Sequence, residues 1–148
     1  MEFKLEVVAV PVTDVDRAKA FYNSLGWRFD ADFTVDEDLR VVQFTPPGSG
    51  ASIMIGKGIT AGAPGSLQGL YLIVDDIIAA REDIAARGIE ISEVWHDAKG
   101  IWHHEGGKDR VAGPDPERKT YASYASFTDP DGNGWFLQEI TTRLPGRS

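Results

Sequence analysis

The amino-acid sequence predicts an α+β protein made of two tandem βαβββ modules within one domain. The first observation behind this prediction is an internal duplication: residues 74–77 (Val-Asp-Asp-Ile) align without a gap with residues 12–15 (Val-Thr-Asp-Val). The second is that each copy leads from an apolar run into apolar residues at helical spacing. The third is a pair of apolar runs near residue 140, separated by a tight turn at residues 129–133 (Asp-Pro-Asp-Gly-Asn).

The first module begins with a predicted strand at residues 7–12 and a predicted helix at residues 15–25. Asp14 is the predicted N-cap, because its carboxylate can accept from the exposed N–H groups of the first turn. Gly26 is placed to end the helix in the left-handed conformation. Three strands then complete the module, at residues 27–33, 40–45 and 51–55. We therefore assign module 1 to about residues 5–56 and read the stretch at residues 57–68, rich in Gly, Ala, Pro and Ser, as a linker.

The second module covers about residues 69–140. Its helix is predicted to begin after Asp76 and to end at Gly88, the counterparts of Asp14 and Gly26. A strand is predicted at residues 89–95 and an irregular insertion, either a binding lid or disordered, at residues 96–120. Tyr121 to Phe127 and Trp135 to Ile140 have the composition of adjacent strands joined by the turn at residues 129–133.

Composition limits the classes of partner. The chain has 148 residues and a formal charge of −8, which opposes a nucleic-acid partner because phosphate binding depends on clustered Lys and Arg. Cationic or neutral small molecules fit this charge better. No apolar run approaches the ~20 residues of a membrane span, and residues 1–6 do not resemble a secretory signal. With no cysteine, disulfides are excluded, and we expect a cytoplasmic protein.

The turn at residues 129–133, followed by an apolar strand, resembles the closing element of the vicinal oxygen chelate superfamily, and both helix entries extend the resemblance to about residues 5–140. This superfamily includes glyoxalase I, extradiol dioxygenases, fosfomycin-modifying enzymes and bleomycin-binding proteins. The resemblance implies a single glyoxalase-like domain in which two curved mixed sheets line a pocket. It also implies a homodimer.

The resemblance places the metal ligands of the family's enzymes at positions that correspond to Val7, Gly69 and Phe136. None of these side chains can bind a metal, so we expect no cofactor and no metal at this place. Glu139 lies three residues after Phe136 and is predicted to point to the other face of the strand, as a surface or structural carboxylate.

Three histidines in the insertion, His96, His103 and His104, are the candidate catalytic residues, because imidazole titrates near neutral pH. They have two alternative interpretations. A divalent metal could use His96, one of the adjacent pair, and Asp97 or Glu105. The histidines could also serve only as polar or packing residues of the loop.

Strand alternation and the loop aromatics predict an apolar pocket with a few polar anchors. The predicted ligand-binding residues are Val7, Ala9, Gly69, Tyr71, Trp102, Phe136 and Gln138.

These observations support three hypotheses. The first is a metal-free protein that binds a small apolar or aromatic molecule, either to sequester it or to transform it by acid/base chemistry. The second is a glyoxalase-type lyase or isomerase with a metal held by the loop histidines. The third is a non-catalytic homodimeric partner module.

Overall fold

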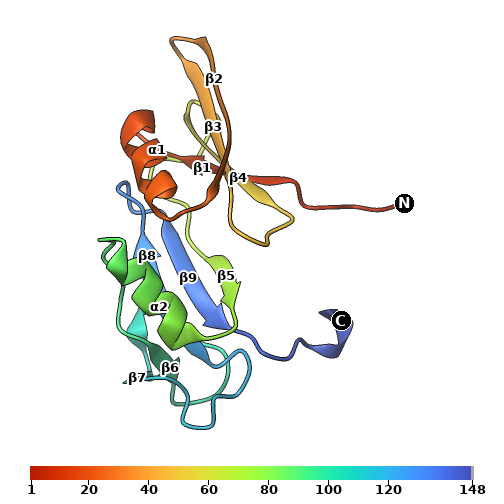
Figure 1. Cartoon of the computed structure of the whole chain (residues 1–148), viewed down its shortest axis with the longest axis vertical. Helices are drawn as coiled ribbons and strands as arrows, with labels where there is room; N and C mark the ends of the chain where they lie inside the picture. The colour runs from red at the N-terminus through yellow and green to blue at the C-terminus, as the bar shows by residue number, and fades with distance from the viewer. Residues whose placement is uncertain (148) are drawn as a thin grey trace. The chain divides into compact units, whose positions relative to one another are not determined.

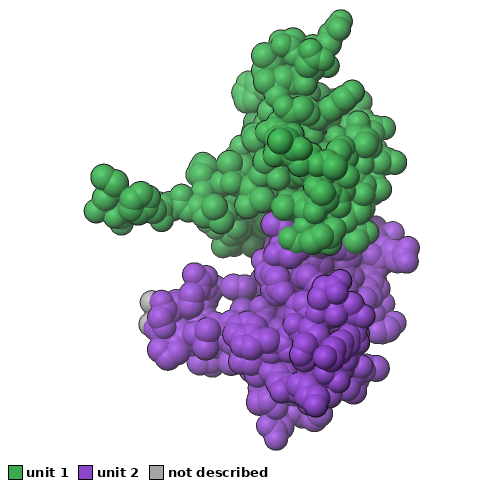
Figure 2. Space-filling view, turned by 180° about the vertical axis from the view of Figure 1, so that it is seen from behind, with its two compact units in different colours: residues 1–68, 128–134 green, residues 69–127, 135–148 purple. Residues whose placement is uncertain are grey.

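The computed structural model describes residues 1–147 and separates into two compact units, coloured separately in Figure 2. Unit 1 consists of residues 1–68 and 128–134, and unit 2 of the described residues among 69–127 and 135–148. Each unit has one helix and one mixed sheet, so the predicted α+β class is confirmed (Figure 1). Among the described residues, no helix is long and apolar enough to cross a bilayer.

Unit 1 follows the order βαβββ. Its sheet order is β1-β4-β3-β2, in which β1 runs parallel to β4 and the other pairs are antiparallel. Figure 1 shows the residues before β1 as an extended segment. The elements of unit 1 are β1 (Val7–Pro11), α1 (Val15–Ser24), β2 (Arg28–Asp36), β3 (Leu39–Thr45) and β4 (Ser52–Lys57).

Unit 2 has the sheet order β5-β9-β8-β6-β7, with β5 parallel to β9. The strand β7 is an addition to the predicted βαβββ pattern, and it pairs antiparallel with β6. The elements of unit 2 are β5 (Leu70–Val74), α2 (Ile77–Ala86), β6 (Trp95–Asp97), η1 (Glu105–Gly107), β7 (Arg110–Ala112), β8 (Ser123–Thr128), β9 (Gly134–Glu139) and η2 (Pro145–Arg147).

Both helices begin and end where the sequence predicted. The Asp14 carboxylate accepts from the Arg17 N–H at 3.0 Å, and the Asp76 carboxylate accepts from two N–H groups at 3.1 Å. Gly26 and Gly88 follow the helices with φ of 78° and 82°, the left-handed region that favours glycine. The duplicated sequence therefore specifies the same capping chemistry twice.

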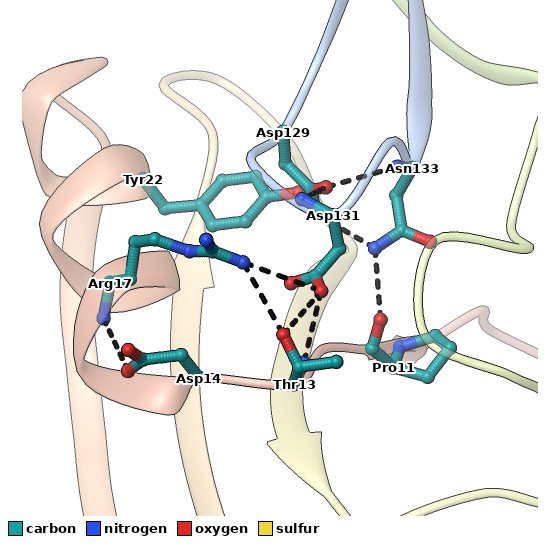
Figure 3. A network of polar contacts seen from close by, with 8 residues as sticks. All are labelled: Pro11, Thr13, Asp14, Arg17, Tyr22, Asp129, Asp131 and Asn133. Carbon is teal, nitrogen blue, oxygen red and sulfur yellow. Dashed lines mark hydrogen bonds and ion pairs between the residues drawn. The ribbon is translucent and has the colours of Figure 1, made fainter.

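The turn at residues 129–133 belongs to unit 1 (Figure 3). The buried Asp129 carboxylate accepts from the backbone N–H groups of Asp131 (2.9 Å) and Asn133 (3.0 Å), as an Asx-type turn requires. The second carboxylate of the turn, Asp131, bonds outside the turn. It accepts from the N–H and the hydroxyl of Thr13, at 3.2 and 2.6 Å. The turn thus closes on the entry to α1.

The strand predicted at residues 89–95 is largely wrong, because β6 begins only at Trp95. Backbone groups in the preceding residues are bonded outside a regular ladder. The Arg81 guanidinium donates to the carbonyls of Ile91 and Ser92, and the Ser92 hydroxyl accepts from the Ser126 N–H. The insertion at residues 96–120 is also more ordered than predicted, since it contains β7 and η1.

Glu139 does point away from Phe136, as predicted, but it is not a surface residue. Its side chain is buried and accepts from the N–H of Ile77, the first residue of α2, at 2.9 Å. Arg118 Nε donates to the same carboxylate at 3.0 Å. These donors, the Arg118 guanidinium first, hold the pKa of the Glu139 carboxyl below its usual value. Glu139 is therefore a structural carboxylate beneath α2.

Candidate functional site

The candidate site lies on the face of the unit 2 sheet opposite α2. Because Glu139 of β9 meets the first turn of α2, strand alternation directs Phe136 and Gln138 to the opposite face. Tyr71 of β5 is the register partner of Phe136, and their ring centroids are 5.0 Å apart. This face therefore carries aromatic side chains on adjacent strands.

Four rings from four strands form what we call the aromatic cage: Tyr71 (β5), Phe136 (β9), Tyr124 (β8) and Trp95 (β6). The Trp95 and Tyr124 rings stack with centroids 4.8 Å apart, and the Tyr124 and Phe136 centroids are 6.5 Å apart in an edge-to-face arrangement. Trp95 and Tyr124 are buried, whereas Tyr71 is 46% exposed. The cage thus contains two buried rings and, at Tyr71, a partly exposed one.

The imidazole of His103, which comes from the loop between β6 and β7, packs against all four rings. Its centroid lies 4.7 Å from Phe136, 4.8 Å from Tyr124, 5.2 Å from Trp95 and 6.1 Å from Tyr71. The His103 Nε2 atom is also 2.7 Å from the Tyr71 hydroxyl. Of the three candidate histidines, His103 is the one that the fold brings to the predicted binding residues Tyr71 and Phe136.

The hydrogen-bond partners of His103 assign its tautomer. Nδ1 lies 3.3 Å from the carbonyl oxygen of His104, which can only accept, so Nδ1 carries a proton. Burial raises the pKa of the Tyr71 phenol, which therefore remains a donor and offers its proton to Nε2. In the tautomer with its proton on Nδ1, the His103 ring accepts one hydrogen bond at Nε2 inside the cage.

Gln138 supports the cage through hydrogen bonds. Its Nε2 donates to the Tyr124 hydroxyl and to the Tyr121 carbonyl, both at 3.0 Å. The Tyr124 hydroxyl in turn donates to the carbonyl of Ile101 at 2.8 Å. Burial raises the pKa of the Tyr124 phenol well above its usual value, which keeps this donor protonated. Both N–H groups of Gln138 are thus used within the protein, and its role here is to position Tyr124.

Trp95 has one polar atom without a partner. Its Nε1 is buried and has no acceptor among the residues that the structure describes. The Arg110 guanidinium lies over the Trp95 ring, 3.7 Å from its centroid. Arg110 belongs to β7, which pairs with β6 on the side opposite to β8, the strand of Tyr124. A buried indole N–H without an acceptor costs about 1–3 kcal/mol, and a bound molecule or water could supply the missing partner.

A second polar cluster contains Asp97, His104 and Asp109. Asp97 is buried, and its carboxylate accepts from the Lys99 N–H (2.7 Å) and from the His104 Nδ1–H (2.7 Å). These donors, the Lys99 N–H first, hold the pKa of the Asp97 carboxyl below its usual value. One ligand atom from each of Asp97, His104 and Asp109 lies within 4.8 Å of the others, a donor set that could hold a divalent cation.

His96 and Trp102 lie outside both arrangements. His96 is buried, and its Nδ1 is 2.8 Å from the carbonyl oxygen of Gly113. Trp102 is 56% exposed and has its ring contact with Tyr121, at 5.5 Å. The predicted metal grouping of His96 with one of the adjacent histidines therefore does not form, whereas the grouping of His104 with Asp97 does.

The remaining predicted binding residues are Val7, Ala9 and Gly69. Val7 and Ala9 are half-buried on β1 of unit 1, and their role stays a prediction. Gly69 precedes β5 with φ of 79°. Phe136 is one of the four rings of the aromatic cage. The residues at the three positions of the family's metal ligands therefore do not fit a metal, since none supplies a donor atom from its side chain.

Sequence reasoning missed Trp95, Tyr124 and Asp109. Tyr124 could have been found from strand alternation, since it lies in the strand predicted at residues 121–127. Trp95 lay at the end of the strand predicted at residues 89–95, most of which does not form. No sequence signal pointed to Asp109.

Unit 1 has an open hollow of about 550 Å³ beside the start of α1 and the β2–β3 turn. It has no aromatic side chain in its lining, and it is lined by Thr13, Asp14, Val15, Thr34, Asp36, Glu37, Asp38, Leu39, Arg40 and Lys57. We favour the aromatic cage as the site, because its rings can select a ligand by shape.

Each sheet has a parallel pair of strands at one edge, and a helix follows the first strand of each sheet along the chain. These features define a protein of paired βαβββ-type modules. The chain belongs to the Glyoxalase/Bleomycin resistance protein/Dioxygenase superfamily, whose family model matches residues 4–137. No curated protein matches the chain.

Solved structures resemble nearly the whole chain. TnmS3, an antibiotic-binding protein from Streptomyces sp. CB03234, is 27% identical with a TM-score of 0.66, over 94% of this chain and 97% of its own. A glyoxalase/bleomycin resistance protein from the same strain is 28% identical with a TM-score of 0.63, over 91% and 99% of the two chains. A superfamily member from Sphaerobacter thermophilus DSM 20745 is 25% identical with a TM-score of 0.67, over 93% and 98%.

Proposed function

We propose that this protein binds a small molecule by holding its aromatic ring in the aromatic cage, without a metal at the family's ligand positions. The observation that carries the proposal is the convergence of four rings, from β5, β9, β8 and β6, on one face of the unit 2 sheet. An antibiotic-binding protein of the same fold, 27% identical over nearly the whole chain, supports a binding role.

Two polar groups give the site direction. The Tyr71 hydroxyl meets the occupant of the cage, and the unpartnered Trp95 Nε1–H is a second donor. An apolar site with a few polar anchors is the usual composition of a small-molecule site. The chain's net charge of −8 favours neutral or cationic ligands over anionic ones.

The experiment is a binding screen with naphthalene, quinoline and 1-naphthol, read by intrinsic tryptophan fluorescence and calorimetry. Phe136→Ala should raise Kd roughly tenfold, because an aromatic pair contributes about 0.5–1.5 kcal/mol beyond the area that it buries. The matched control is Phe33→Ala, which removes a 66% exposed phenylalanine from β2 of unit 1. Equal affinity in both variants would contradict the proposal.

Sequestration and turnover are distinguished by the fate of the ligand. Recovery of the bound compound unchanged after prolonged incubation supports a binding protein. A product of changed structure, lost in His103→Ala, supports acid/base chemistry by an imidazole near neutral pH.

A second candidate function is a glyoxalase-type lyase or isomerase with a divalent metal. The cluster of Asp97, His104 and Asp109 favours it, because imidazole and carboxylate together suit zinc, manganese or iron. Elemental analysis and thermal unfolding with each metal test this function, since a native-state ligand raises Tm. About one equivalent of metal, lost in His104→Ala and in Asp109→Asn, would make the enzyme the leading candidate.

We also propose a homodimer in the cytoplasm, whose surface would be the functional part if the cage binds nothing. Met1, Phe3 and Leu5 alternate with charged residues and are at least 69% exposed, which supports an uncovered apolar segment. Analytical ultracentrifugation of the full chain, compared with Phe3→Ser/Leu5→Ser, tests this assembly.

A further inference from the structure

We propose that His103 is an internal substitute for the ligand's ring, and that the cage selects a planar ring with an acceptor atom directed at the Tyr71 hydroxyl. This inference rests on the proposed function, because it names the chemical class that the same site would bind. The His103 ring contacts all four members of the cage, and its position indicates which chemistry the cage accepts.

The contacts of His103 are those of a bound ring. Its centroid distances to the four rings, 4.7 to 6.1 Å, lie in the range in which aromatic rings pack favourably. The residue is half-buried, and it contacts two buried rings, Trp95 and Tyr124, as well as the more exposed rings of Phe136 and Tyr71. It is carried by a loop rather than by a strand, so its departure breaks no sheet hydrogen bond.

The backbone on both sides of His103 is anchored. Ile101 is held through its carbonyl by the Tyr124 hydroxyl, and the His104 N–H donates to Asp97 at 3.1 Å. Exchange of His103 for a ligand therefore requires rotation of one side chain between staggered rotamers, not unfolding of the loop.

The chemistry of the pair defines the ligand class. With the His103 proton on Nδ1, Tyr71 donates to Nε2, and an incoming ring with a nitrogen or carbonyl oxygen at the same place would keep this hydrogen bond. The ring should be neutral, because the Arg110 guanidinium, 3.7 Å from the centroid of the Trp95 ring, opposes a cation, and the chain's net charge of −8 opposes an anion. Neutral nitrogen heteroaromatics and aromatic ketones satisfy both conditions.

Competition between His103 and a ligand predicts the direction in which removing the imidazole changes Kd. If a ligand binds only when His103 has left, its apparent Kd is the intrinsic Kd divided by the open fraction. An open fraction of about 1–10% means that removing the imidazole tightens binding about 10–100-fold. If His103 instead contacts the ligand directly, its removal weakens binding.

The experiment measures the Kd of 4-methylimidazole, which reproduces the histidine ring, and of toluene, which lacks its nitrogen acceptor. Calorimetry is done at about pH 9, where 4-methylimidazole is neutral and keeps its acceptor nitrogen, on the full-length wild type, His103→Ala and His103→Phe, with folding checked by circular dichroism. His103→Ala should bind 4-methylimidazole at least tenfold more tightly than the wild type and in preference to toluene. His103→Phe keeps the cage filled with a ring and should bind neither probe better than the wild type does.

The role of Tyr71 is tested in the His103→Ala background. Adding Tyr71→Phe should abolish the preference for 4-methylimidazole over toluene. Adding Tyr121→Phe, whose hydroxyl accepts from the Leu144 N–H, should preserve it.

Three outcomes would overturn the inference. They are weaker binding by His103→Ala, tighter binding by His103→Phe, and equal affinity for the two probes in His103→Ala. If either of the first two occurs while quinoline or naphthalene still binds the wild type in a Phe136-dependent manner, the proposed function stands without this inference. If no probe binds the wild type or any folded variant, both fail together.

Discussion

The hydroxyl of Tyr22 donates a 2.8 Å hydrogen bond to the carboxylate of Asp129, 107 residues further along the chain. Tyr22 is fully buried in α1, and Asp129 is the carboxylate that organises the turn at residues 129–133 (Figure 3). Asn133 joins the same network by donating to Asp129 and to the Pro11 carbonyl. The turn is therefore part of the core of unit 1, in addition to connecting two strands.

Removing this hydroxyl should destabilise the protein measurably. Tyr22→Phe leaves a buried carboxylate with one donor fewer, and the free energy of unfolding should fall by about 2 kcal/mol, since hydrogen bonds to charged groups contribute about 1.5–3 kcal/mol. Urea denaturation measures the change. Tyr71→Phe, at a 46% exposed residue, is the control and should lose less than half as much. Equal losses would contradict this account of the turn.

Arg118 should make stability depend on acid pH. Because Arg118 lowers the folded-state pKa of the Glu139 carboxyl, the ion pair adds stability above the unfolded-state pKa of about 4.3. This contribution is lost as the pH falls through the lower, folded-state pKa. Arg118→Met should thus cost about 1–2 kcal/mol at pH 7, discounted for the partial exposure of the arginine.

The difference between wild type and Arg118→Met should shrink as urea unfolding is repeated from pH 6 toward pH 3. The control is Arg28→Met, which removes a 71% exposed arginine from its pair with Asp30 and should change stability little. A difference that stays constant down to pH 3 would exclude the ionised pair as its source.

Two glycines with nearly the same φ should respond differently to alanine. Gly65 (φ 80°) and Gly69 (φ 79°) both occupy the left-handed region, which costs a residue with a Cβ about 1–2 kcal/mol. A Cβ at Gly65 would also collide with the backbone carbonyl of Asp131, whereas a Cβ at Gly69 meets open space. Gly65→Ala should therefore lower Tm clearly more than Gly69→Ala. A larger drop in Tm for Gly69→Ala than for Gly65→Ala, measured by differential scanning calorimetry, would refute the close approach of Gly65 to the Asp131 carbonyl.

Asp97 should control the order of the loop that carries His103. Its carboxylate accepts from the N–H groups of Lys99 and His104, so Asp97→Asn removes the charge that both bonds use. Limited trypsin digestion should cleave the variant faster after Lys99 and Lys108 than it cleaves the wild type. Unchanged cleavage would show that the loop is held by other contacts.

The sequence predicted those parts of the fold that depend on local chemistry. Asp14, Gly26, Asp76 and Gly88 determine their helix ends through contacts within a few residues, and the duplication made each assignment support the other. The turn at residues 129–133 was recognisable for the same reason. Its hydrogen bonds to Thr13 were not, because they join residues 118 positions apart.

Contacts between different elements of the fold also explain what the sequence did not predict. Arg81 takes up carbonyls at Ile91 and Ser92, which a propensity argument assigns to a strand. Predicting the cage requires the register of β6, β8 and β9, because this register brings Trp95, Tyr124 and Phe136 together. His103 and His104 are adjacent in the chain, yet His103 packs against the cage and His104 bonds to Asp97.

The discontinuity of unit 1 affects how the protein is made. Its residues 1–68 emerge from the ribosome first, yet the unit also needs residues 128–134. Until those residues are synthesised, the Tyr22 hydroxyl has no Asp129 and the Pro11 carbonyl has no Asn133. Residues 1–68 therefore lack these two contacts until residues 128–134 are synthesised, and a gene fragment that encodes residues 1–68 alone should yield an unstable chain that depends on chaperones.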